Sequence, residues 1–270
     1  MKIIFWCEFP EKADWNRIEK SLSELNYYTD IYICAKSREE FDNLQKEIRT
    51  KCRHIKEINV WPVLSFEEGY WFSGFCSRKS IDKLLEYEGL KIKVDLEPPI
   101  PKMNFSTSLL AFYGIYKLFR RAKNKLHLEN TIKELAKSSE VISNEFPVPI
   151  AVQKRIAGHT DPNKVQNVEI NYISYSTFFG LLRPAARLYY TMFAKRRIRK
   201  FKGRTMFSIG MLGPGIFGDE PYYKNPSELR KDLEMVKQAG AKKIAIYTIE
   251  TLAQRKNPFE WLKIIKEYSD

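Results

Sequence analysis

Two carboxylates stand two residues apart near the end of one short alternating stretch of this chain. Residues 90–97 read Leu-Lys-Ile-Lys-Val-Asp-Leu-Glu, and Pro98 and Pro99 follow directly. Side chains two apart on a β-strand point to the same face, so we expect Asp95 and Glu97 to lie together at the C-terminal end of a strand. Two neighbouring carboxyl groups can supply the acid and the base, or the acid and the nucleophile, of glycosyl transfer.

Lys93 shares the predicted face of Asp95, two residues further back along the strand. A neighbouring cation favours the charged form of a carboxyl group. We therefore expect Lys93 to contact Asp95 and hold it ionised, which leaves Glu97 as the group that keeps a proton for donation.

Strand-like and helix-like stretches alternate along the whole chain. Eight apolar or alternating runs predict strands over residues 2–8, 29–35, 57–64, 90–97, 140–146, 168–175, 205–212 and 243–249. Helix-like stretches follow them over residues 14–25, 38–51, 79–87, 108–137, 150–156, 178–200, 227–239 and 258–268. Eight such pairs predict a single (β/α)₈ barrel, an α/β fold, spanning residues 1–270 as one domain.

A doubly wound open sheet is the alternative architecture, and it would need a glycine-rich phosphate loop. The run from Gly210 to Gly215 has the glycines, but it contains Pro214 and no helix starts directly after it. We interpret this run as a wide loop over the mouth of the barrel, and we expect no cofactor.

Active sites of such barrels lie at the C-terminal ends of the strands, where this chain gathers acids and aromatics. Besides Asp95 and Glu97, the candidates at these ends and in the adjoining loops are Glu8, Trp61, Trp71, Glu145, Asn171, Tyr175, Tyr247 and Glu250. Aromatic rings stack on sugar rings and carboxylates accept from sugar hydroxyls. We expect these acids and aromatics to line a site for a carbohydrate substrate.

The sequence Val94-Asp95-Leu96-Glu97 resembles the end of the strand-4 motif D-x-x-D-x-D-x-E of chitinase-type glycosidases, glycoside hydrolase family 18. Tyr175 is similarly placed to the tyrosine of that family's strand-6 motif M-x-Y-D. The resemblance implies that Glu97 donates a proton to the leaving oxygen, that Asp95 orients the substrate's acetamido group, and that Tyr175 steadies that group.

Four positions depart from the family pattern. Leu90 and Lys93 stand where the strand-4 motif has aspartates, and Ser176 stands where the strand-6 motif has one. Tyr247 occupies the place of a common strand-8 tryptophan. The missing aspartates keep open a second hypothesis, a non-catalytic barrel that binds saccharide or membrane.

A metal-dependent sugar isomerase or lyase is a third hypothesis. Glu97, Glu145 and Glu250 would come from strands 4, 5 and 8, which supply carboxylate ligands in xylose-isomerase-like barrels. Sites of that kind also use histidine, and we expect His54, His127 and His159 to be solvated or to cap helices. An all-carboxylate Mg²⁺ or Mn²⁺ site stays open on the sequence.

The chain is strongly basic, with 46 Lys and Arg against 33 Asp and Glu, a net charge of +13. This charge indicates either a polyanionic partner or simply a lysine-rich surface. Residues 106–126 and 176–204 each place an apolar, aromatic stretch before a cluster of cations. These two segments could be covered by long loops, could form a homodimer interface, or could dock on an anionic membrane. The membrane alternative would favour a membrane-proximal or lipid-linked sugar as the substrate. Nucleic acid is not expected, because no motif for it is present.

The four cysteines show no C-x-x-C spacing, and no apolar run approaches the ~20 residues that cross a bilayer. We expect reduced thiols and a cytoplasmic protein, peripheral at the membrane if the lipid interpretation holds.

Overall fold

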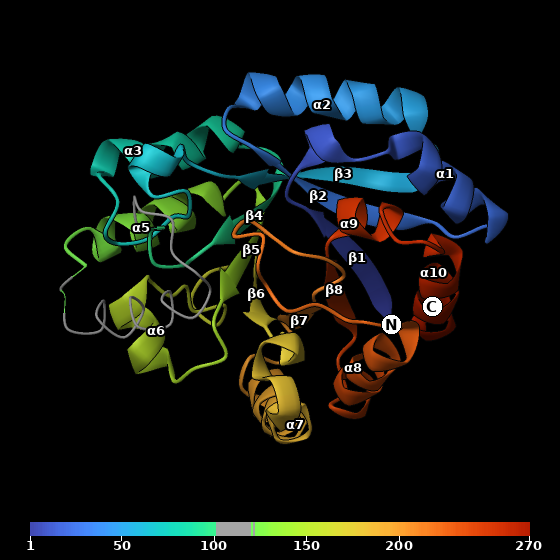
Figure 1. Cartoon of the computed structure of the whole chain (residues 1–270). Helices are drawn as coiled ribbons and strands as arrows, with labels where there is room; N and C mark the ends of the chain where they lie inside the picture. Colours follow the sequence, from blue (N-terminus) through green and yellow to red (C-terminus); the bar gives the residue numbers. More distant parts are fainter. Residues whose placement is uncertain (101–119, 121) are drawn as a thin grey trace. The chain divides into compact units, whose positions relative to one another are not determined.

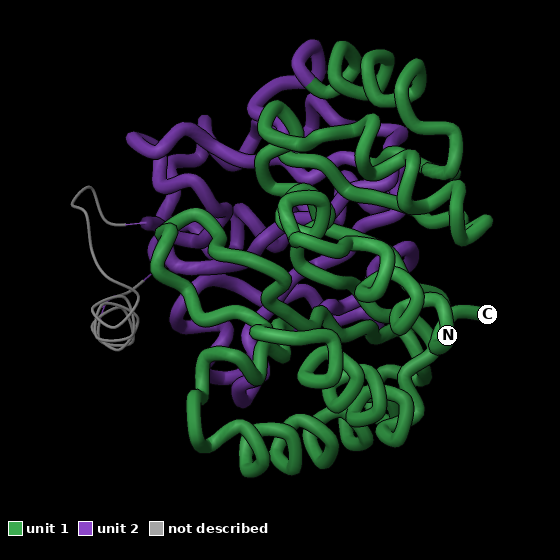
Figure 2. Tube along the Cα trace, turned by 45° about the vertical axis from the view of Figure 1, so that its right-hand side comes forward, with its two compact units in different colours: residues 1–34, 41–59, 173–270 green, residues 35–40, 60–172 purple. Residues whose placement is uncertain are grey.

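The computed structural model describes residues 1–100, 120 and 122–270 (Figure 1). Most of the basic segment 106–126 and the start of the predicted helix 108–137 therefore lie outside the described residues. The chain forms two compact units (Figure 2). The first holds Met1–Cys34, Phe41–Asn59 and Ile173–Asp270, and the second holds Ala35–Glu40 and Val60–Tyr172.

Eight parallel strands follow one another in chain order and close into a barrel, which confirms the predicted (β/α)₈ fold. The strands are β1 Lys2–Cys7, β2 Thr29–Ala35, β3 Ile55–Pro62, β4 Lys91–Asp95, β5 Glu140–Glu145, β6 Val168–Ile173, β7 Thr205–Gly210 and β8 Lys243–Tyr247. Nearly every strand residue is buried, as expected of a parallel sheet that is covered on both faces.

The helices between the strands match most of the predicted stretches. They are α1 Trp15–Glu24, α2 Arg38–Lys51, α3 Arg78–Asp82, α5 Lys125–Leu135, α6 Ile150–Ile156, α7 Arg183–Lys200, α8 Pro226–Gln238, α9 Ile249–Ala253 and α10 Pro258–Tyr268. Four 3₁₀ segments add to them, namely η1 Pro10–Lys12, η2 Phe66–Glu68, η3 Lys83–Tyr87 and η4 Ser176–Leu182.

Two predicted helices are interrupted and one short helix was not predicted. The stretch 79–87 divides into α3 and η3, and the stretch 178–200 divides into η4 and α7. The second break lies next to Gly180, whose φ of 50° is a left-handed conformation that favours glycine. The unpredicted helix is α9, directly after β8.

Helix α8 begins one residue before the predicted stretch 227–239 and has a capped N-terminus. Pro226 is its first residue, and the side chain of Asn225 accepts from the backbone N–H of Glu228 at 3.2 Å. Helix α10 begins at the predicted proline, Pro258, although the Asn257 side chain makes no cap hydrogen bond.

Seven of the eight strands end one or two residues before their predicted ends, because the chain turns into a loop where the hydrogen-bonded ladder stops. At β4, the regular strand ends at Asp95, and Leu96 adds a single parallel bridge to Phe72. Glu97 therefore lies just beyond the strand rather than on it.

Candidate active site

Lys93 and Asp95 form a buried ion pair at the end of β4. The Nζ atom of Lys93 lies 2.7 Å from Oδ1 and 3.0 Å from Oδ2 of Asp95, and the two side chains are 1% and 3% exposed. Their common face follows from the two-residue spacing on the strand. The predicted Lys93–Asp95 contact is confirmed.

The ammonium group of Lys93 has a second partner on β3. Its Nζ atom lies 2.9 Å from the centre of the Trp61 ring, a cation–π contact in a buried setting. Trp61 was predicted to face a sugar, and the structure shows Lys93 over its ring.

Asp95 also accepts a hydrogen bond from the neighbouring strand. The strand register pairs Asp95 with Asn144 on β5, and Asn144 with Asn171 on β6. Asn144 Nδ2 donates to Asp95 Oδ1 at 2.6 Å, and the amide of Asn171 donates to the side-chain oxygen of Asn144. The buried carboxylate is thus held from two sides, by a cation on its own strand and by an amide chain across β5 and β6.

Replacing Lys93 by methionine should leave the buried Asp95 carboxylate without its cation. We expect the free energy of unfolding, measured by urea denaturation, to fall by about 3–5 kcal/mol. Lys91→Met is the control, because Lys91 is half-buried and its contact with exposed Glu140 spans 3.8 Å; it should change stability by less than about 1 kcal/mol. Equal, small effects of the two substitutions would contradict a buried ion pair.

Glu97 lies two residues after the end of β4 and is half-buried, whereas Asp95 is buried. The backbone around it is fixed: the N–H of Phe72 donates to Asp95 O at 3.1 Å, and the N–H of Leu96 donates to Asn144 O at 2.9 Å. The Glu97 side chain is the more solvent-accessible of the two predicted catalytic carboxyls, a position that suits proton exchange with a ligand.

Glu145 and His159 form a second buried pair in the same unit. His159 Nδ1 lies 2.9 Å and 3.0 Å from the two carboxylate oxygens of Glu145, which also accept from Ser143 Oγ at 3.2 Å and from the Thr160 N–H at 3.3 Å. The expectation that His159 is solvated was wrong, since it is 4% exposed. Its local sequence, Gly-His-Thr in a loop after α6, carries no signal of this partner, because Glu145 lies 14 residues earlier on β5.

The other two histidines are surface-proximal, with partners of their own. His54 Nδ1 lies 2.8 Å from Glu19, and His127 Nε2 lies 2.6 Å from Asp82. Among the residues described, no group of three or more His, Cys, Asp and Glu side chains is placed to hold a metal ion.

Trp71 lies in the loop after η2, half-buried, with its ring edge-on to that of Tyr70 at a centroid distance of 5.8 Å. The loop is tight, because Gly69 has a φ of 108° and a Cβ there would lie 2.6 Å from the Pro99 Cβ. The prediction that Trp71 binds a sugar stays a prediction.

In the first unit, the structure brings together three residues predicted at the ends of β1 and β8. The hydroxyl of Tyr247 donates to the carboxylate of Glu8. The Oε1 atom of Glu250 accepts from the backbone N–H of Glu8 at 2.9 Å and of Phe9 at 3.2 Å. All three side chains are buried, so Glu250 fixes the start of the loop after β1 and Tyr247 fixes the Glu8 carboxylate.

Burial is the largest influence on the pKa values of Glu250, Tyr247 and Cys7 in this cluster. It raises the pKa of Glu250 above its usual value, against the lowering effect of the backbone N–H groups that the carboxyl accepts from. Burial and then the Glu8 carboxylate raise the pKa of Tyr247 well above its usual value, and burial and then Glu250 do the same for the Cys7 thiol. Glu250 is therefore a carboxyl group that the fold favours in its protonated form.

Tyr175 lies beside Tyr247, with ring centroids 5.7 Å apart, and the ring of Phe178 lies 5.8 Å from it on η4. The predicted strand-6 and strand-8 tyrosines thus meet. The loop after β7 packs closely against both tyrosines. If Gly210 carried a Cβ atom, that atom would lie 3.2 Å from the Tyr175 ring, and a Cβ atom at Gly215 would lie 2.5 Å from the Tyr247 hydroxyl. The carboxylate of Glu220, which was not among the predicted residues, holds this loop by accepting from the N–H of Gly215 at 3.0 Å.

Glu250→Gln should change how stability depends on pH. The raised pKa means that ionising Glu250 opposes folding, so the wild-type free energy of unfolding should fall, relative to the variant, as pH rises from about 4.3, the unfolded value, through the raised folded value. Denaturant unfolding at a series of pH values measures this difference. The exposed Glu260→Gln on α10 serves as control and should keep the wild-type slope; parallel curves for wild type and Glu250→Gln would contradict the assignment.

Comparison with solved structures places this barrel near glycosidase barrels. The glycoside hydrolase domain of PgaB (BpsB) from Bordetella bronchiseptica superposes with a TM-score of 0.56 at 10% identity, covering 95% of this chain and 96% of that one. A xyloglucanase of family GH5 from Bacteroides ovatus gives 0.51 at 8% identity, over 95% and 68%. A family 18 chitinase from Crocus vernus gives 0.50 at 11% identity, over 99% of each chain.

No protein-family model and no curated protein sequence matches this chain. The structural similarities establish the (β/α)₈ fold and support a distant resemblance to glycosidase barrels. At these identities they carry the fold alone, so the chemistry must be argued from the side chains.

Proposed function

We propose that this barrel acts on a glycosidic bond, with Glu97 as the general acid and Asp95 as its fixed anionic partner. The observation that carries the proposal is the held carboxylate at the end of β4, where Lys93 and Asn144 both bind Asp95 within 2.7 Å. Glu97 follows two residues later on a backbone fixed by two strand-type hydrogen bonds. A positioned carboxyl group beside a second, immobile carboxylate is the arrangement that glycosidases use.

In this proposal the proton resides on Glu97 and passes to the leaving oxygen as the glycosidic bond breaks. In the route that the resemblance implies, the substrate's acetamido oxygen, oriented by Asp95, attacks the anomeric carbon as that bond breaks, and water then opens the resulting intermediate. The resemblance to chitinase-type enzymes adds an expected 2-acetamido sugar as the substrate class and a role for Tyr175 in steadying the acetamido group.

Glu97→Gln should abolish proton donation while keeping the size of the side chain. On oligosaccharides or nitrophenyl N-acetylglucosaminides we expect kcat to fall by about a hundred- to ten-thousand-fold with little change in KM. Dinitrophenolate is a stable anion and departs without being protonated. The variant should therefore lose much less activity on dinitrophenyl glycosides. This dependence on the leaving group is the diagnostic measurement.

The exposed Glu86→Gln in η3 is the matched control and should keep wild-type kcat. A Glu97→Gln enzyme that loses the same factor on both leaving groups, or none, would contradict the role as general acid.

A non-catalytic saccharide-binding barrel is the second candidate, and one observation favours it. Lys93 replaces an aspartate of the family motif and takes up both oxygens of Asp95, which limits the freedom of that carboxylate to turn toward a substrate. Calorimetric binding of chitin oligosaccharides without turnover by the wild-type protein would support this candidate over the enzyme.

A further inference from the structure

One side of η4 and α7 exposes a continuous row of side chains that begins apolar and ends basic. Its members recur at helical spacing and are all exposed; we call them the α7 stripe, and they are Leu181, Ala185, Leu188, Met192, Arg196 and Arg199. Leu181 is 99% exposed and Leu188 is 64% exposed. Exposed Phe178, Phe179 and Tyr189 broaden the apolar end. Contiguous exposed apolar side chains of this kind mark a surface that contacts another phase or molecule.

The charge around the stripe has one sign. No Asp or Glu occurs between residues 170 and 218, while this stretch holds nine cations, Arg183, Arg187, Lys195, Arg196, Arg197, Arg199, Lys200, Lys202 and Arg204. Within the part of the chain that the structure describes, no carboxylate forms an ion pair with Arg196 or Arg199. The basic end of the stripe thus presents uncompensated positive charge to solvent.

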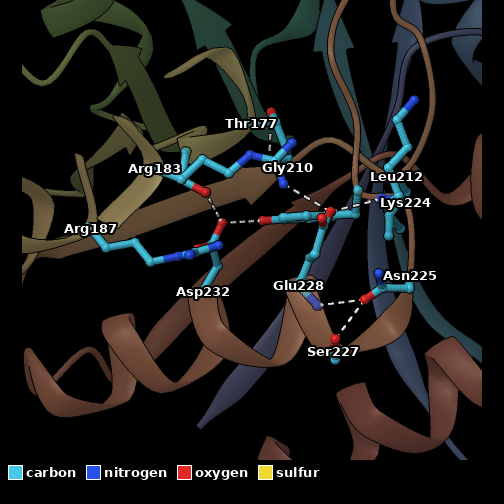
Figure 3. A network of polar contacts seen from close by, with 12 residues as sticks. Thr177, Arg183, Arg187, Gly210, Leu212, Lys224, Asn225, Ser227, Glu228 and Asp232 are labelled. Carbon is cyan, nitrogen blue, oxygen red and sulfur yellow. Dashed lines mark hydrogen bonds and ion pairs between the residues drawn. The ribbon is translucent and has the colours of Figure 1, made fainter. Parts of the chain in front are cut away.

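The opposite side of α7 is fastened to α8, so the stripe cannot rotate inward (Figure 3). Arg187 Nε lies 2.5 Å from Oδ1 of the buried Asp232, which also accepts from Tyr223, and Arg183 lies 2.8 Å from Glu228. The two cations nearest the start of α7 are therefore used for packing. At its far end, Arg197 and Lys200 lie over the rings of Phe193 and Phe201, whereas Arg196 and Arg199 are exposed.

We propose that the α7 stripe docks the protein on an anionic lipid surface, with Leu181 and Leu188 in the headgroup–acyl boundary and Arg196 and Arg199 among the headgroups. Apolar side chains followed by cations on one exposed face are the composition of helices that lie in a membrane interface. Among the described helices, none is both long and apolar enough to cross a bilayer. Lipid fits better than a second copy of the chain, because two such stripes would bring like charges together. This inference goes beyond the proposed function and does not depend on it.

Sedimentation of the full chain with vesicles tests the proposal. We expect binding to phosphatidylcholine vesicles that contain phosphatidylglycerol, little binding to phosphatidylcholine alone, and weaker binding as salt is raised, since headgroup attraction is screened.

Matched substitutions separate the stripe from net charge and from general hydrophobicity. Arg196→Gln with Arg199→Gln should weaken binding to the mixed vesicles by about thirtyfold, whereas Lys20→Gln with Lys46→Gln, exposed on α1 and α2, removes the same charge and should change it only slightly. Leu188→Gln should weaken binding by about tenfold, and Leu85→Gln, at a residue 39% exposed in η3, should not. Circular dichroism confirms that each variant is folded.

Three results would overturn the proposal. If the test and control charge variants lost vesicle binding equally, net charge rather than the α7 stripe would cause the attraction. If the wild-type protein did not bind the mixed vesicles, lipid would be excluded as the partner. A dimer in light scattering that Leu188→Gln abolishes would assign the stripe to a second copy of the chain.

Discussion

A carboxylate that leaves water must be compensated, and the arrangement at the end of β4 follows from the burial of Asp95. The Lys93 ammonium supplies the opposite charge at 2.7 Å, and Trp61 covers the ammonium in turn. Asn144 and Asn171 continue the contact across two further strands, which is feasible because the parallel register sets the three side chains in one row. The site is therefore rigid at Asp95 and more open at Glu97.

Other buried acids of the molecule meet the same requirement by different means. Glu145 is paired with a histidine, and Glu250 accepts backbone N–H groups while its pKa is raised by burial. Asp232 is held by an arginine and two hydroxyl groups. Glu145 and Glu250 each tie a loop or helix to a strand end, and Asp232 ties α8 to α7, η4 and the loop before α8, so buried acids position the loops of this barrel.

Helix α7 forms ion pairs with carboxylates on one side and exposes apolar and basic side chains on the other. Toward α8 its arginines meet carboxylates, and the contact is fixed. Away from α8, the α7 stripe exposes Leu181, Leu188 and Met192, and no carboxylate among the described residues forms an ion pair with its Arg196 or Arg199. A helix that is anchored on one side and unsatisfied on the other is best explained by a partner, and the sign of its charge points to an anionic one.

The sequence by itself determined the fold. Eight alternations of strand-like and helix-like stretches leave few other architectures, and the two-residue spacing on β4 places Lys93 on the same face as Asp95. These features are local: periodicity of two or of 3.6 and the geometry of a pleat act over a few residues.

Only the tertiary structure decided which side chains meet across the strands. The contacts Asn144 to Asp95, His159 to Glu145 and Tyr247 to Glu8 join residues 49, 14 and 239 positions apart. The register of the barrel, the ends of the strands and the paths of the loops determine these pairs. Local sequence periodicity predicts none of these three features. The same reason explains why Glu97 falls beyond its strand, since a strand ends where its neighbour stops pairing with it.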